Sequence, residues 1–207
     1  MQLASGEDVT WSDLKAPLTT INVTCRLNLL VLLGACNGAG LLEVIQLTDR
    51  APVWGLIGPT RTVTAGEIED AHRAFYRTLF SSRDGGTAWR AMNAAVTAAD
   101  SPFRFFGAEA MFCEVMRGYF REYCSDEKLA ERTRRLVAVT ARRDGATAEG
   151  IRMFEVKIGQ YLRDHPSRFE EIRKHFFFVD LCPEHSDRFN VSLDDCFSVC
   201  DESATAV

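Results

Sequence analysis

The feature that most constrains the fold is a run of five apolar residues that ends at a turn of small residues. The run spans residues 29–33, and the turn is Gly34-Ala35-Cys36-Asn37-Gly38. An apolar run of this length, bounded by glycine, is typical of a buried strand in an α/β sheet. We expect the strand over 27–33 and a short helix over 41–47. Cys36 is thereby predicted at the carboxyl edge of a strand, where open α/β sheets place their ligand sites and a helix N-terminus favours a thiolate.

A cysteine nucleophile usually works with a histidine base, and none precedes Cys36. No histidine occurs among the 35 residues before Cys36, and the first in the chain is His72. His72 is a candidate substitute base, although its place near Ile68 and Phe75 on an expected helix also suits a structural histidine. Cys36 likewise has a structural interpretation, because free cysteine is commonly a small, buried and inert residue.

Composition limits the class of protein. A chain of 207 residues with 46% hydrophobic content can form one large domain, or one domain with an extension. Its net charge of −5 argues against a general nucleic-acid role. No apolar run reaches the ~18 residues of a transmembrane helix, and no signal-peptide pattern is present. The seven scattered cysteines are typical of reduced thiols. We expect a cytoplasmic protein without nucleic-acid or membrane partners.

The order of elements predicts an α/β fold with a mostly parallel sheet in residues 1–100. A very short strand is expected over 1–4 and a helix over 11–20, with Thr10 as its N-cap. After the helix expected over 41–47, a second buried strand is expected over 52–59. Two helices come next, over 65–80 and 87–99, and this strand–helix order favours parallel pairing.

The remainder of the chain, residues 101–200, is expected to be a mainly helical extension. Three helices are expected, over 108–123, 126–142 and 146–164. Apolar residues recur at helical spacing in the first and the third, whereas the arginines of the second, balanced by glutamates, are typical of a solvated face. A short helix after Pro166 and a strand or extended segment over 176–179 follow. The last residues, 201–207, form a small-residue tail that we expect to be disordered.

The turn and its neighbours resemble a known family. Ala35-Cys36-Asn37-Gly38 after an apolar strand is similar to the nucleophile turn of caspase-like (clan CD) cysteine peptidases, whose local signature is Ala-Cys-x-Gly. The order of the segments at 8–14, 53–58, 75–79 and 88–92 resembles more closely the bacterial CHAT subgroup. The resemblance covers residues 1–99.

The resemblance implies Cys–His hydrolysis of a protein or peptide. Cys36 matches the nucleophile and its backbone N–H one oxyanion donor, with Asn37 and Gly38 completing the turn. The family's histidine, in a His-Gly turn about 50 residues upstream, has no counterpart here. The chain thus resembles the second half of the fold and is expected to be inactive alone. Three explanations stay open: a truncated reading frame, a degenerate pseudo-peptidase, or a site completed by another chain.

Two other functions remain possible at this level. The first is a non-catalytic protein-interaction module that kept the scaffold and lost the chemistry. Without the family's upstream strands, the strand at 27–33 or its neighbour would present an apolar edge, from which we expect a homodimer or poor solubility.

The second is a zinc-stabilised structural domain. Cys182, His185, Cys196 and Cys200 form two short pairs of soft or borderline ligands, which could hold tetrahedral zinc. The spacing is not that of a standard zinc finger, so the alternative is a set of ordinary reduced thiols and no cofactor.

Overall fold

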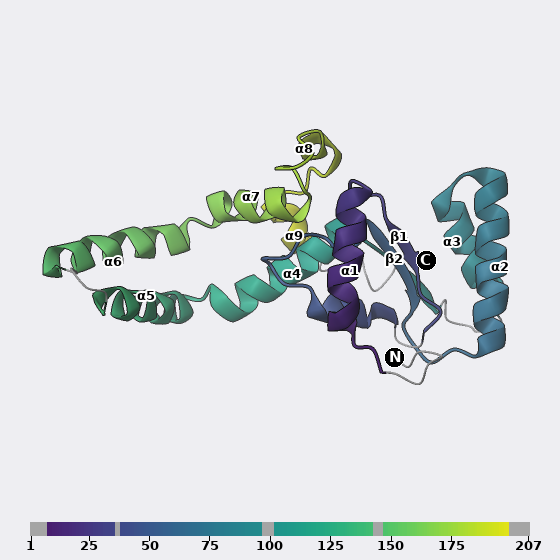
Figure 1. Ribbon diagram of the computed structural model, residues 1–207, viewed down its shortest axis with the longest axis horizontal. Helices are drawn as coiled ribbons and strands as arrows, with labels where there is room; N and C mark the ends of the chain where they lie inside the picture. The colour runs from purple at the N-terminus through teal and green to yellow at the C-terminus, as the bar shows by residue number, and fades with distance from the viewer. Residues whose placement is uncertain (1–7, 36–37, 97–101, 143–146, 199–207) are drawn as a thin grey trace.

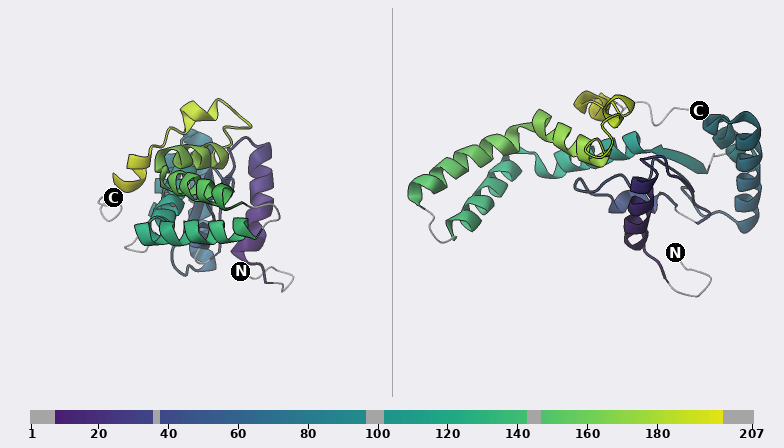
Figure 2. Two further views of the ribbon diagram at one scale, coloured as in Figure 1. Left: turned by 90° about the vertical axis from the view of Figure 1, so that its left-hand side faces the viewer. Right: turned by 45° about the horizontal axis from the view of Figure 1, so that its top comes forward.

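The protein is an α/β structure in which a small mixed sheet lies between two groups of helices (Figure 1). The computed structural model describes residues 8–35, 38–96, 102–142 and 147–198. Helices α2 and α3 cover one face of the sheet, and α1 lies on the other. Helices α5 and α6 project away from the sheet as an arm (Figure 2). The strand expected over 1–4 and the tail at 201–207 lie outside the described residues.

The sheet has three strands in the order β1 (Leu30–Leu32), β2 (Gly55–Pro59), β3 (Phe103–Gly107). β1 and β2 are parallel, with Leu30 opposite Gly55, whereas β2 and β3 are antiparallel, with Pro59 opposite Phe103. The expectation of a mostly parallel sheet is therefore wrong. The physical reason is that α2 and α3 pack as a pair and return the chain to the carboxyl end of β2, so that β3 begins beside Pro59 and runs antiparallel to β2.

Four helices precede β3 in the described part of the chain, and side chains cap the starts of the three α-helices among them. They are α1 (Trp11–Thr24), the 3₁₀ helix η1 (Gly38–Val44), α2 (Ala65–Ser82) and α3 (Gly85–Ala94). Thr10 and Thr64 each accept a hydrogen bond from the backbone N–H three residues on, and the side chains of Asp13 and Glu67 complete both capping boxes. The expected N-cap at Thr10 is confirmed, and the helix it begins continues through Pro17 to Thr24.

Of the later helices, the first four are expected from the sequence and the last two are not. They are α4 (Ala108–Tyr123), α5 (Asp126–Ala141), α6 (Ala148–Arg163), α7 (His165–Phe176), α8 (His185–Arg188) and α9 (Leu193–Ser198). The strand expected over 176–179 is absent: Phe176 ends α7 and a turn follows, with Phe178 at φ 60°. These phenylalanines are fully buried, and burial in a helix end produces the same apolar run as burial in a strand.

Two hydrophobic clusters sandwich the sheet. Ile57 faces α2 and α3 and packs with Phe75, Met92 and Phe103. Its neighbour Leu56 faces the opposite cluster, as the alternation of side chains along a strand requires. That second cluster joins buried residues from η1, α4, α7 and the C-terminal segment; they include Leu41, Met111, Phe112, Phe169, Phe176, Phe177 and Phe189.

The domain boundary expected at residue 100 divides a single sheet and core. β3 pairs with β2, and Phe112 of α4 contacts Phe169, Phe176 and Phe177 of the α7 segment at ring-centroid distances of 5.1–5.4 Å. The part of the extension that stands apart is the arm of α5 and α6, because neither cluster contains its residues.

The strand that leads to Cys36 lies at the edge of the sheet. β1 is half-buried along its length, whereas every residue of β2 is buried. The backbone groups of Leu29 and Leu33 form hydrogen bonds with β2 and the residues before it. Because the backbone groups of successive residues in a strand point in opposite directions, those of Leu30 and Leu32 point away from β2. Within the described residues no strand pairs with that edge. The expected apolar sheet edge is therefore present, and β1 is the strand that forms it.

None of the helices in the described ranges combines the length and the apolar character needed to cross a membrane.

Candidate functional site

The proposed nucleophile turn is only partly within the structure. Cys36 and Asn37 lie outside the described residues, and Gly38 is the first residue of η1. The geometry of the site is therefore that of its frame: the carboxyl end of β1, the start of η1 and the face of α2 that packs on the sheet.

His72 belongs to this frame. Its imidazole extends from α2 toward the end of β1, where a Cβ placed on Gly34 would lie 3.5 Å from His72 Cε1 and 3.2 Å from Ile68 Cγ2. The ring of Phe103, in β3, lies on another side, with 6.4 Å between the ring centroids. The structure thus places His72 beside a residue two positions before Cys36, although the two are far apart in sequence.

The Nε2 atom of His72 is buried and has no hydrogen-bond partner among the described residues. A buried polar atom without a partner costs free energy, and such atoms are rare in folded proteins. Burial also lowers the pKa of His72, because an imidazolium would lose its hydration there. The ring is therefore neutral at pH 7, with a nitrogen able to accept or donate one hydrogen bond.

Asn22 fixes the entry to β1. This fully buried amide accepts a hydrogen bond from the backbone N–H of Leu29 at 3.0 Å and donates one to the carbonyl of Ala51 at 2.9 Å. β1 then continues along β2 to the 2.8 Å bond between Leu33 N–H and the Ile57 carbonyl. β1 is consequently held at its start by α1 and at the end beside His72 by β2.

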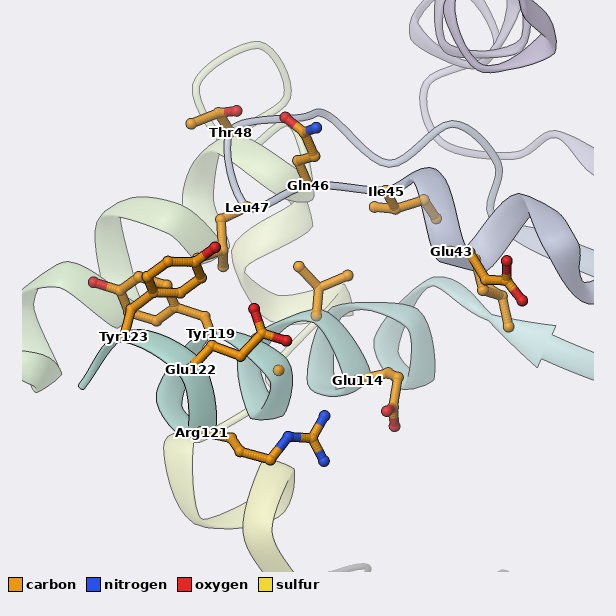
Figure 3. Close-up of a pocket in the computed structure, with 13 residues that line it drawn as sticks. Glu43, Ile45, Gln46, Leu47, Thr48, Glu114, Tyr119, Arg121, Glu122 and Tyr123 are labelled. Carbon is orange, nitrogen blue, oxygen red and sulfur yellow. The ribbon is translucent and has the colours of Figure 1, made fainter. Parts of the chain in front are cut away.

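A groove of about 810 Å³ lies between α4 and the segment that begins with η1 (Figure 3). Tyr119 and Tyr123 of α4 stack beside Leu47 at one end, and Glu43 and Glu114 lie at the other. His72 does not line this groove. Its lining thus combines carboxylates and tyrosines with the apolar side chains of Leu42, Ile45 and Leu47.

The expected four-residue zinc set does not assemble as a unit. Cys182 and His185 do lie together, and their nearest third donor is Glu184, with the three ligand atoms within 4.8 Å of one another. Cys200 lies outside the described residues. Glu184 stands between the two other donors in Cys182-Pro183-Glu184-His185, but the spacing of cysteines and histidines contains no signal for a carboxylate ligand.

Cys196 pairs instead with Cys113 across α9 and α4, and both are buried. A hydrogen bond between the two thiols raises the pKa of Cys196. The same bond, together with the charge of Arg117, lowers the pKa of Cys113. Arg117 also donates to the Cys196 carbonyl at 3.0 Å. This contact explains why Cys196 is separated from Cys182, and spacing along the chain contains no signal for it.

Comparisons with protein-family models, curated proteins and solved structures produce no match. The class that the fold itself defines is α/β, with a three-stranded mixed sheet.

Proposed function

We propose that the chain is a caspase-like, CHAT-related cysteine hydrolase domain in which Cys36 is the nucleophile and His72 the substitute base. The observation that carries the proposal is the buried, unpartnered Nε2 of His72 on a ring that lies against Gly34. Consecutive Cα atoms are about 3.8 Å apart, so whatever conformation it takes, Cys36 stays within about 7.6 Å of Gly34, measured between Cα atoms.

The neutral state of His72 defines how the pair would work. Because burial lowers the pKa of His72, a resting thiolate–imidazolium pair is disfavoured and general-base catalysis is favoured. The imidazole takes the thiol proton as Cys36 Sγ attacks the carbonyl carbon of a peptide. It then gives that proton to the leaving amine as the C–N bond breaks, and water hydrolyses the resulting thioester.

The sheet edge at β1 supports the same family relationship. The caspase-like resemblance requires further strands beside the one that ends at the cysteine, and the backbone of Leu30 and Leu32 faces an edge without a strand partner in the described part of the chain. A second copy pairing there would continue the sheet, so we also propose a homodimer through this edge.

The test is the rate of alkylation at Cys36 at pH 7, measured by mass spectrometry of the peptide that contains it. Iodoacetamide should label Cys36 several-fold faster at pH 7 than the exposed Cys25, and His72→Phe should remove the difference while retaining a buried aromatic ring beside Phe103. Equal rates at Cys36 and Cys25 in both proteins would refute the assignment of His72 as base.

One observation favours a second function, a protein-interaction module. The arm of α5 and α6 exposes Leu136, Val139, Met153 and Val156, and exposed apolar clusters commonly mark protein contacts. Under this alternative Cys36 has ordinary thiol reactivity, and Cys36→Ala leaves every binding property unchanged. The alkylation experiment therefore separates the two functions.

A further inference from the structure

The segment between α7 and α8 brings three metal-ligand side chains together by a tight turn. The backbone N–H of His185 donates to the Cys182 carbonyl at 2.9 Å, which closes a turn with Pro183 in its second position, where proline is favoured. Cys182 and His185 therefore occupy the two ends of one turn. The buried ends flank the exposed Glu184.

His185 is oriented as a metal ligand. Its Nδ1 lies 2.7 Å from the carbonyl oxygen of Phe177, and because a carbonyl only accepts, Nδ1 carries the proton. Nε2 is then the nitrogen with a free lone pair, as in metal sites where a backbone carbonyl fixes the tautomer. The ring also packs edge-on against Phe189, at 5.4 Å between centroids, so its orientation is held on two sides.

Neither the Cys182 thiol nor His185 Nε2 has a hydrogen-bond partner within the described residues. We propose that Cys182 Sγ, His185 Nε2 and the Glu184 carboxylate bind one Zn²⁺ ion, with water as the fourth ligand. A thiolate, an imidazole and a carboxylate are the three donor types that zinc accepts together. The two negative donors balance the charge of the ion, which favours a partly buried site.

The distances fit after a small movement. Zinc–ligand bonds of about 2.0–2.3 Å place tetrahedral donors about 3.3–3.8 Å apart, and the three donor atoms here lie within 4.8 Å of one another. Glu184 is exposed, so its side chain can close the remaining gap without disturbing the core. Zinc would then hold the α7–α8 turn against Phe177 and Phe189, whose stacked rings have centroids 4.9 Å apart.

This inference is independent of the proposed hydrolase function, and it is tested by titrating the chelator-treated full chain with Zn²⁺ in a calorimeter. We expect one ion per chain. Co²⁺ in place of Zn²⁺ should produce a sulfur-to-cobalt charge-transfer band, because the site contains a thiolate.

The variants identify the ligands. Cys182→Ser should abolish the charge-transfer band, and Glu184→Gln should weaken zinc binding by more than about tenfold, since loss of even outer-shell partners costs about 10–100-fold. Glu184 is exposed, so its substitution leaves the fold intact, and Cys25→Ser is the matched control that removes a thiol elsewhere. Absence of saturable binding overturns the proposal, as does unchanged affinity in both Cys182→Ser and Glu184→Gln.

Discussion

Asn22 should be among the most sensitive polar positions in the protein, because one side chain satisfies two buried backbone groups. Asn22→Ala leaves the Leu29 N–H and the Ala51 carbonyl without the partners they have at 3.0 and 2.9 Å. An unsatisfied buried donor or acceptor costs about 1–3 kcal/mol, so the two together cost about 2–6 kcal/mol. Alanine recovers up to about 0.7 kcal/mol in helix propensity. We therefore expect a net loss of about 1–5 kcal/mol in the free energy of unfolding.

The assay is urea unfolding followed by far-UV circular dichroism. A loss of stability should lower the midpoint at an unchanged slope, and in thermal unfolding each kcal/mol should lower the Tm by about 2–4 °C for a chain of this size. Thr20→Ala, on the exposed side of the same helix, is the control and should stay within about 0.5 kcal/mol of the parent.

Asn22→Asp separates the two hydrogen bonds. The carboxylate still accepts from Leu29, but it faces the Ala51 carbonyl with a negative charge, and only the protonated form can donate to that oxygen. Its destabilisation should therefore shrink as the pH falls. A loss below about 1 kcal/mol in Asn22→Ala would contradict the view that this amide holds β1 in place.

Three further predictions concern His72, the arm and the sheet edge. Because burial lowers the pKa of His72 below the ordinary value of about 6.5, the unfolded chain binds the proton more readily. The contribution of neutral His72 to the free energy of unfolding should be complete above about pH 6.5 and should be lost as the pH falls below that value. The Tm of His72→Phe, measured over the same pH series, should lack this decrease. Parallel pH profiles of the two proteins would contradict the prediction. Replacing residues 126–163 by a short glycine–serine linker should leave a cooperatively folded body, which near-UV circular dichroism would report. A short linker can span the gap, because the rings of Phe120 and His165 on either side of the arm are 5.1 Å apart. The core should persist, because neither hydrophobic cluster contains residues of the arm. Light scattering should find a dimer at high concentration, and Leu32→Pro, which removes an outward N–H from β1, should reduce its mass to that of one chain; a monomer at all concentrations would exclude pairing at this edge.

Local signals along the chain predicted most of the helices. Thr10 with Asp13, and Thr64 with Glu67, mark two helix starts through capping that depends only on residues three apart. The apolar stripes of 108–123 and 146–164 predicted α4 and α6 to within a few residues, and α5 agrees with the helix expected over 126–142. These features depend on contacts within one turn of helix, which is why periodicity and caps suffice.

Apolar runs were less informative, because burial and not conformation makes them apolar. Residues 29–33 and 176–179 are similar in hydrophobicity, yet the first contains a strand and the second a helix end and a turn.

The sequence by itself determined the α/β class, the capped helices and the residue types available for chemistry: a cysteine after a strand, and a cysteine and histidine three apart. Only the tertiary structure decided that His72 lies against Gly34, that Glu184 completes a donor group with Cys182 and His185, and that Cys196 pairs with Cys113. The reason is physical. A helix cap or an apolar face of a helix depends on residues within one or two turns of the chain. The contacts of His72 with Gly34 and of Cys196 with Cys113 depend instead on how α2 packs on the sheet and how α9 packs on α4, which no local sequence pattern encodes.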